Sequence, residues 1–342
     1  ITYTQVESPI DIVSKDPGER IDLRNVFTIT IDGLRNKKLD NVLFDDCFAL
    51  TGSGNDLHIL VSVPDVDLII DRDSLIDSYM RSLGESVYVK GNEKALLDRR
   101  FAREISLEKD KDRNTITFDI NVDSDGNVKG IDFYKSIVRV NYNFTKDACD
   151  QFMKYNDFDE RLNVLKKMYD LAVKLCRKRK DVIGRRSPAK VIMDEFNILP
   201  DLQTAKFFND NGIVFPYKNY FGKLRNNSRK HIAKVHEFIK NNHLDEESSE
   251  LISSVINTFK YPFYDTIFVD NKAYHGFPCG SVGNPMREYI SLESDRLIKD
   301  IVIDNKNNEN YWKERIERDC IEYTATSAKI RELYNNNNKR GR

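Results

Sequence analysis

The fold and its site are decided by two stretches, Phe27-Thr-Ile-Thr-Ile-Asp32-Gly and Leu43-Phe-Asp45-Asp46-Cys-Phe-Ala-Leu50. Both are apolar in the manner of buried strands, and three carboxylates crowd the end of the first and the start of the second. Like charges this close repel, so folding alone rarely selects them. A divalent cation removes the repulsion, and carboxylate oxygens suit Mg²⁺ and Mn²⁺. An ordinary polar turn is the alternative, because Asp, Gly and Asn are common turn residues.

Hydrophobic periodicity predicts the remaining elements. Strand patterns cover 26–31, 48–50, 58–63, 115–122 and 130–143, with a turn at 123–126. Helical patterns cover 70–83, a region that begins near 145, and then 189–208, 228–241, 246–261, 288–300 and 309–334. The first helix should begin after Asp71 or Asp73 and stop near Gly84, and Pro200 should bend or end the helix over 189–208. Early strands and late helices predict an α+β fold.

Composition bounds the class of protein. With 40% hydrophobic and 32% charged residues, the 342-residue chain has a globular composition and no apolar run near the length of a membrane span. Its 54 basic and 55 acidic residues nearly cancel, which still allows a basic channel beside acidic catalytic groups. The five cysteines have no zinc spacing, so we expect reduced, mostly buried thiols and a cytoplasmic protein without a membrane partner.

Several motifs occur in the order found in the ribonuclease II / ribonuclease R (RNB) family of exoribonucleases, which the chain therefore resembles. The first run from Arg20-Ile-Asp-Leu-Arg24 through Asp46 and continue at Leu57-His-Ile-Leu-Val-Ser-Val-Pro-Asp65-Val66. The later ones are Ser86-Val-Tyr88-Val, Asp112-Arg113-Asn-Thr-Ile-Thr-Phe, Tyr134-Lys-Ser-Ile-Val-Arg139, Lys190-Val-Ile-Met-Asp-Glu195-Phe and Asn284-Pro-Met-Arg287-Glu-Tyr289. The resemblance implies an RNB-type catalytic domain, a mixed β-sheet core surrounded by helices with a central RNA channel. We expect it over 26–334, after an irregular lead-in at 1–25 and before a disordered polar tail at 335–342.

The resemblance also implies the metal ligands. Four acids surround the site in the family, and Asp32, Asp45 and Asp46 match three of them. The fourth falls on Leu43, while Asp40, in a longer loop, is the expected substitute. Placing the gap differently would align Asp40 and its neighbour with the last two acids, but it would break the register of the following strand. The implied cofactor is Mg²⁺ or Mn²⁺.

The remaining implied contacts are with single-stranded RNA, the expected partner. Arg287 should clamp phosphate, because a guanidinium fork meets two oxygens at once. Tyr88 should stack on bases near the cleaved end, and Glu195 and Tyr289 should also contact the strand. The structural alternatives are a surface arginine, a core tyrosine and a solvated helix glutamate. Basic stretches at 174–190 and 223–230 are further candidates for the channel, or else charged helix faces.

Three hypotheses for the function follow. The chain is a metal-dependent exoribonuclease that degrades single-stranded RNA from the 3′ end to nucleoside 5′-monophosphates. Alternatively it is a decayed relative that binds RNA or a protein without cleavage, as Leu43, Glu288, Ser291 and a missing hairpin between 183 and 187 indicate. The third is a structural subunit of a larger assembly. Because the first residue is Ile1, we expect a piece of a longer chain with flanking RNA-binding domains.

Overall fold

A mixed seven-stranded sheet forms the centre of the computed structural model, which describes residues 18–32, 42–88, 93–155, 160–220 and 262–340. The strand order is β1-β6-β5-β4-β3-β2-β7, with β1–β6 and β2–β7 parallel and the other pairs antiparallel. The strands are β1 Ile21–Asp22, β2 Thr28–Asp32, β3 Cys47–Ser53, β4 Asp56–Pro64, β5 Asp112–Val122, β6 Val128–Arg139 and β7 Tyr142–Thr145. The predicted α+β class with a mixed sheet is confirmed. Strand β1 lies within the expected lead-in at 1–25, so the end of that segment is part of the sheet.

Alternation along the strands separates the two faces of the sheet. In β5, Ile116, Phe118 and Ile120 are fully buried in the main hydrophobic core. Thr117 points to the other face, where its hydroxyl lies 2.7 Å from that of Ser62 on β4. Buried hydroxyls that pair with one another avoid the cost of an unsatisfied polar group. One face of the sheet is therefore apolar and covered, and the other carries a polar seam.

Helix α1 (Leu75–Leu83) begins slightly later than the periodicity predicts. Asp73 has a left-handed backbone with φ of 61°, which cannot continue into a right-handed helix. The next residue, Ser74, is the N-cap and accepts a hydrogen bond from the Asp77 amide. Gly84, with φ of 75°, ends the helix as predicted.

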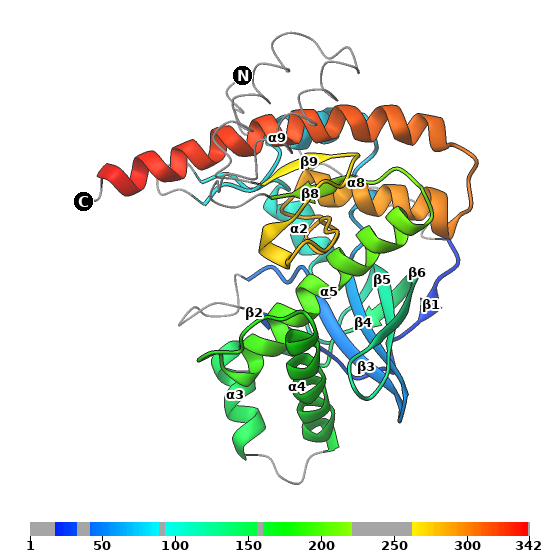
Figure 1. Ribbon diagram of the computed structural model, residues 1–342, viewed down its shortest axis with the longest axis vertical. Coiled ribbons are helices and arrows are strands. Elements are labelled where there is room, and N and C mark those ends of the chain that lie inside the picture. The colour runs from blue at the N-terminus through cyan, green and yellow to red at the C-terminus, as the bar shows by residue number, and fades with distance from the viewer. Residues whose placement is uncertain (1–17, 33–41, 89–92, 156–159, 221–261, 341–342) are drawn as a thin grey trace.

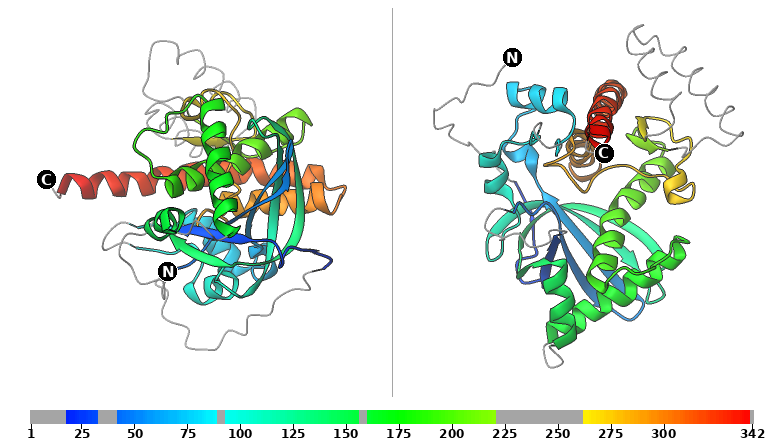
Figure 2. Two further views of the ribbon diagram at one scale, coloured as in Figure 1. Left: turned by 90° about the horizontal axis from the view of Figure 1, so that it is seen from below. Right: turned by 90° about the vertical axis from the view of Figure 1, so that its left-hand side faces the viewer.

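Helix α5 (Pro188–Asp210) lies against the apolar face of the sheet, as Figures 1 and 2 show. Pro200 does not end this helix, contrary to one of the two predicted outcomes, because α5 continues for ten residues beyond it. Proline inside a helix costs about 3 kcal/mol. Burial offsets that cost here, since Pro200 and its neighbours Leu199 and Leu202 are all buried. The ring of Phe196 also meets that of Phe48 on β3 edge to face, at 5.8 Å.

The other described elements complete the layers around the sheet. They are η2 Val66–Leu68, α2 Arg99–Ile105, α3 Lys146–Tyr155, α4 Glu160–Lys178, the β8–β9 pair (Tyr217–Asn219 and Phe263–Asp265), η3 Lys272–Tyr274, α8 Tyr289–Leu297, the π-helical η4 Ile298–Ile303 and α9 Glu309–Arg340. Figure 1 shows α3 and α4 at one end and the long α9 at the other. The helices predicted at 228–241 and 246–261 lie outside the described residues. Residues 335–340 of the expected polar tail continue α9 in the structure.

A buried ion network joins α8 to α1 and to η2. The fully buried Arg296 guanidinium donates to Asp67, Asp77 and Glu293 at 2.8, 2.6 and 2.6 Å. On α9, Arg315 donates to Glu293 at 3.1 Å. The network fixes α8, and with it the residues just before α8, relative to the sheet.

Among the described residues, no helix has the length and apolar character needed to cross a bilayer. All five cysteines are free and buried, as the sequence predicts.

Replacing Arg296 tests the network. Arg296→Met keeps an apolar chain of similar length but removes one guanidinium from three carboxylates, which keep their contacts with Arg315 and Lys299 of the network. Removing one partner of a buried ion pair costs about 3–5 kcal/mol of unfolding free energy. Urea denaturation followed by circular dichroism measures the loss.

The matched control is Lys206→Met, which removes an exposed ion pair with Asp210 on α5. Its denaturation midpoint should equal that of the wild type. A midpoint for Arg296→Met close to that of this control would contradict the structural role of the network.

Candidate active site

The predicted metal ligands meet where β2 ends and β3 begins. These strands are antiparallel, with Ile29 opposite Phe48. Asp32 ends β2 and Asp45 lies just before β3, close enough for the Asp32 carboxylate to act electrostatically on Asp45. Asp45 is only 4% exposed, and Asp46 is half-buried.

Arg287 reaches the same point from the far end of the chain. Its Nε forms an ion pair with the Asp45 carboxylate. Its backbone is fixed against the segment after α1, because the Ser86 amide donates to the Arg287 carbonyl and the Tyr289 amide donates to Gly84, both at 2.8 Å. The Arg287 side chain remains 42% exposed, so part of the guanidinium stays accessible.

Tyr88 follows Ser86 in that segment and is 62% exposed. It lies close enough to Arg287 for its hydroxyl to act electrostatically on the guanidinium. The alternative of a core tyrosine does not fit this exposure. An exposed ring beside a partly exposed arginine suits contact with a polyanion that carries bases.

The electrostatics of the cluster follow from burial and from like charge. Burial raises the pKa of Asp45 to about 6, with Arg287 opposing the rise and Asp32 adding to it. Burial also raises the pKa of Asp46 to about 7, and the Asp45 carboxylate is the next cause. Burial disfavours the charged form of Arg287, yet the neighbouring acids raise its pKa above the ordinary value. Among the described residues, the pKa shifts of Asp45 and Asp46 reflect one guanidinium, that of Arg287, beside three carboxylates.

The donor set fits a hard divalent cation. The buried Asp45 Oδ1 has no hydrogen-bond partner among the described residues, although its Oδ2 pairs with Arg287. A buried oxygen of this kind needs a ligand. The three carboxylates are nevertheless less tightly gathered than Cys176, Asp181 and Glu195, whose ligand atoms lie within 4.8 Å of one another.

That tighter trio is explained without a metal. Arg179 donates to Glu195 at 2.8 Å and to Asp181 at 3.1 Å. Arg186 donates to the Cys176 sulfur at 3.2 Å. Two guanidiniums already balance the two carboxylates, so no cation is required there.

The substitute for the fourth acid cannot be placed. Asp40 lies outside the described residues. Leu43 is partly buried and packs against the main hydrophobic core. Its alkyl side chain offers no ligand atom.

Two residues predicted to contact RNA have structural partners instead. Glu195 is 2% exposed and paired with Arg179. The alternative interpretation of Glu195 as a solvated helix glutamate is therefore also wrong. Tyr289 is 1% exposed, and its hydroxyl lies 3.2 Å from Asp77 and 3.3 Å from Arg315. Burial in these networks accounts for both side chains, and neither is accessible to an RNA strand.

The structure adds two polar residues of α5 that the sequence analysis did not single out. The Asn197 side chain is exposed and lies close enough to Asp46 to favour the charged form of that carboxyl. Asp201 accepts from the Val282 amide at 2.8 Å, and its carbonyl accepts from the Gly280 amide at 3.1 Å, which ties α5 to the loop ahead of Arg287. The only sequence signal for either residue was its polar side chain within an apolar helical stretch.

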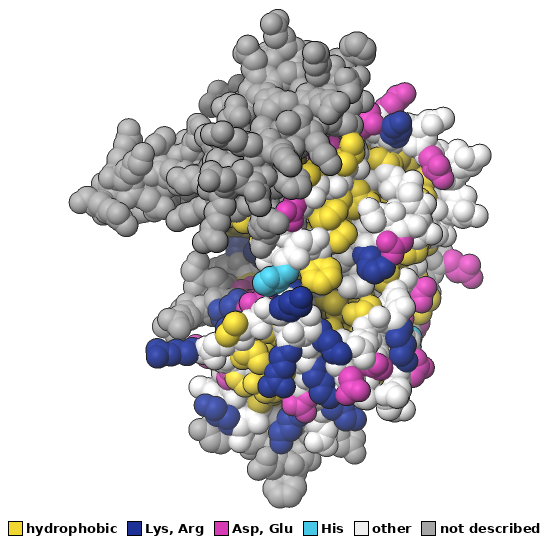
Figure 3. All heavy atoms as spheres, in the orientation of Figure 1, with side chains coloured by type: hydrophobic (Ala, Val, Ile, Leu, Met, Phe, Trp, Pro, Cys, Tyr) yellow, Lys and Arg dark blue, Asp and Glu magenta, His cyan; other side chains and the backbone are white. Residues whose placement is uncertain are grey.

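Basic side chains gather over α4 on the face shown in Figure 3. Within 174–190, Arg179 and Arg186 are committed to acidic partners, whereas Arg177 and Lys180 are exposed. The second basic stretch, 223–230, lies outside the described residues. The surface over α4 therefore stays a candidate for contact with phosphates.

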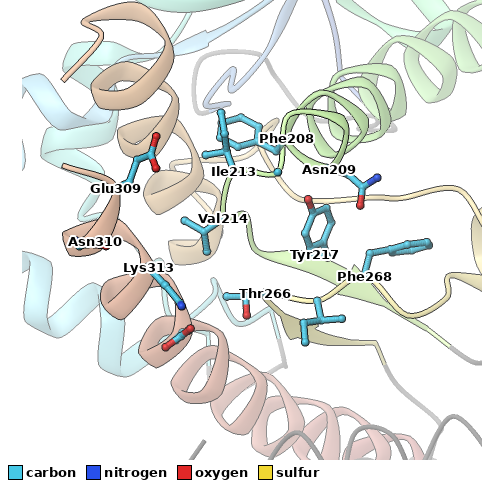
Figure 4. A pocket seen from close by; sticks show the side chains of 13 residues that line it. Phe208, Asn209, Ile213, Val214, Tyr217, Thr266, Phe268, Glu309, Asn310 and Lys313 are labelled. Atoms are coloured by element: carbon cyan, nitrogen blue, oxygen red, sulfur yellow. The ribbon is translucent and has the colours of Figure 1, made fainter. Parts of the chain in front are cut away.

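A separate hollow of about 490 Å³ lies between the end of α5, the β8–β9 pair and the start of α9. Figure 4 shows Glu309 and Lys313 on its α9 side and Tyr217 and Phe268 opposite. Among its described lining residues, Lys313 is outnumbered by Glu309 and Glu317. The lining of this hollow includes none of the predicted site residues, so the cluster at Asp45 remains the candidate site.

Comparison with known proteins places the fold. Ribonuclease R of Thermotoga maritima is 24% identical over 341 residues, covering 85% of this chain and 47% of that protein. Ribonuclease R of Buchnera aphidicola is 20% identical, covering 88% of this chain and 48% of that protein. The chain thus spans about half the length of these relatives.

A solved structure of Mycoplasma genitalium RNase R in complex with ribose methylated single-stranded RNA superimposes with a TM-score of 0.75 at 17% identity, covering 93% of this chain and 57% of that one. Yeast Ssd1, described as a pseudonuclease, superimposes with a TM-score of 0.63 at 15% identity, over 90% of this chain and 44% of that one. At such identities these likenesses show the fold alone. A model of the RNB domain matches residues 20–267, which is most of the chain, and the chain belongs to this family.

Proposed function

We propose that the chain is a metal-dependent exoribonuclease that hydrolyses single-stranded RNA from the 3′ end and releases nucleoside 5′-monophosphates. The substrate, the direction and the product rest on membership of the RNB family and on relatives named ribonuclease R. The free, buried cysteines suit a reducing compartment such as the cytoplasm.

One observation carries the proposal more than any other. Asp45 is buried beside Asp46 and Asp32, with one oxygen against Arg287 and the other without a hydrogen-bond partner in the part of the chain that the structure describes. An unbalanced group of buried acids weakens a fold unless something else requires it. A divalent cation at this point satisfies the free oxygen and the missing positive charge together.

The roles of the residues follow from their positions. Asp32, Asp45 and Asp46 hold Mg²⁺ or Mn²⁺, which when bound supplies an activated water and offsets charge on the scissile phosphate. Arg287 orients the phosphate through the accessible part of its guanidinium, while Asp45 keeps its Nε in place. Tyr88 offers a ring on which a base near the RNA terminus stacks.

A second function is favoured by Leu43. If the family's fourth acid cannot be lost without loss of activity, the chain is an RNB-fold protein that binds RNA or a protein without cleavage. RNA binding would then be unchanged by a chelator and by Asp45→Asn. The first experiment below separates the two functions.

Asp45→Asn should abolish hydrolysis, because a neutral amide is a weaker ligand at the most buried position. With end-labelled single-stranded RNA and Mn²⁺, we expect a rate at least about 100-fold below that of the wild type. Asp56→Asn is the matched control, at an exposed position at the other end of the sheet. Intact RNA after incubation with the wild type contradicts the nuclease function, and equal rates for wild type and Asp45→Asn contradict the site.

Arg287→Lys keeps the charge but removes the planar fork. We expect the single-turnover rate to fall about 10- to 100-fold with the protein still folded, a loss on the scale reported for single charge-stabilising donors. Arg139→Lys, an exposed arginine of β6, should cleave at the wild-type rate. A wild-type rate for Arg287→Lys would remove the clamp from the mechanism.

Tyr88→Ala should weaken RNA binding by about 1–3 kcal/mol, whereas Tyr88→Phe should retain affinity because the stacking ring is kept. Fluorescence anisotropy of labelled RNA in the presence of a chelator measures binding without cleavage. Tyr79→Ala, at an exposed tyrosine of α1, is the control. Equal affinity for Tyr88→Ala and the wild type rules out the stacking role.

A further inference from the structure

A second hollow, of about 300 Å³, lies between the end of α4, α5 and the turn that joins β5 to β6. The loop at 277–278 forms its remaining side, and we call it the α4–α5 hollow. Its lining includes none of the three acids of the candidate site and neither Arg287 nor Tyr88. Small-molecule sites occupy about 300–1,000 Å³, so the α4–α5 hollow has room for one small ligand.

The floor of the α4–α5 hollow is apolar because one stripe of α5 faces it. Glu195, Leu199, Leu202 and Lys206 all line the hollow. They recur at helical spacing and therefore share one face of the helix. The two leucines lie between the two charged residues, and Leu175 of α4 adds a third alkyl side chain. A planar apolar group fits such a floor, because ligand sites are lined mainly by hydrophobic side chains.

An aromatic ring stands at the rim of this floor. Phe277 is 46% exposed, although most large apolar side chains of the described chain are buried. An exposed ring beside an apolar floor offers a surface on which a nucleobase can stack. The amides of Asn127 and Gln203 also line the hollow. Each amide can donate and accept hydrogen bonds, as the edge of a base requires.

The charges of the lining favour an anion. Lys178, Arg179 and Lys206 face one carboxylate, that of Glu195, which Arg179 already pairs at 2.8 Å. Lys206 has an acidic partner on the next turn of α5. The Lys178 ammonium instead donates to the neutral amide oxygen of Asn127, and it forms no ion pair within the described ranges. Figure 3 shows basic side chains over α4 beside hydrophobic ones on the same face.

We propose that the α4–α5 hollow binds one nucleotide, with its base on the apolar floor beside Phe277 and its phosphate at Lys178. This inference rests on the proposed contact with single-stranded RNA. The nucleotide is either one residue of an RNA chain or a free nucleoside 5′-monophosphate, because both carry a base and a phosphate. In a chain, the hollow holds the RNA at a second point apart from Asp45, and two linked contacts bind more tightly than one.

The first test measures the binding of labelled polyuridylate by fluorescence anisotropy, in a chelator that prevents cleavage. Phe277→Ala should weaken binding by about 5- to 100-fold, the loss expected for one stacked base. Phe277→Tyr should restore the affinity, because it keeps the ring. Tyr311→Ala, at an exposed aromatic residue of α9, is the matched control and should bind as the wild type does.

The second test uses the dependence of this binding on salt. Lys178→Met should reduce the slope of log affinity against log salt by about 0.7, the contribution of one phosphate contact on a single strand. A variant that only loosened the fold would leave this slope unchanged. Lys167→Met removes an exposed lysine of α4 about three turns earlier, so it changes the net charge equally and should keep the slope.

Calorimetric titration with uridine 5′-monophosphate separates the two sources. Weaker binding of polyuridylate by Phe277→Ala and Lys178→Met supports a residue of the RNA chain, and weaker binding of the mononucleotide alone supports the free nucleotide. Unchanged binding of both probes by both variants overturns the inference. Stronger displacement of the probe by an oligoglutamate peptide than by RNA also overturns it, because the hollow then suits an acidic protein. Since the chelator prevents cleavage, none of these outcomes depends on nuclease activity.

Discussion

The contact between Asp45 and Arg287 joins the start of β3 to the loop ahead of α8, and the candidate site depends on it. A buried ion pair by itself is weak evidence for stability, because desolvation offsets much of the attraction between the charges. Here the pair is also incomplete, since one Asp45 oxygen has no hydrogen-bond partner within the described ranges and Arg287 stays partly exposed. An interaction that is buried on one side and accessible on the other suits binding better than structural support.

The Arg296 network shows the contrasting case. Its guanidinium is fully buried and pairs with three carboxylates, which leaves no donor for a ligand. Asp295 beside it has no hydrogen-bond partner among the described residues, and burial raises its pKa well above the ordinary value. The two regions therefore differ in purpose. The Arg296 network holds α8 in position, and the Asp45 cluster retains a charge imbalance that a cation can correct.

Family membership fixes the fold of this chain but not its chemistry, because one fold carries different functions. The RNB fold is shared by proteins named ribonuclease R and by one described as a pseudonuclease. What separates these outcomes is the set of oxygens around one point. The resemblance places the family's fourth acid at Leu43, whose side chain packs against the hydrophobic core.

The sequence by itself determined the elements whose signals are local. Alternation predicted β5, a capping serine and a glycine bounded α1, and the spacing of Asp32, Asp45 and Asp46 predicted an acidic site. Pro200 was misread because a local helix-breaking signal was outweighed by burial, a property of the whole fold.

Only the tertiary structure decided which side chains gather at the site. Glu195 and Tyr289 look like functional residues in a motif, yet long-range pairing with Arg179 and Arg315 buries them. Asn197 looks like an unremarkable helix residue, yet it lies close enough to Asp46 to favour the charged form of that carboxyl. A sequence records which chemical groups are available, whereas burial and charge balance depend on neighbours that are distant along the chain. The folded structure brings those neighbours together, and so it decides which of the groups remain free to bind a ligand.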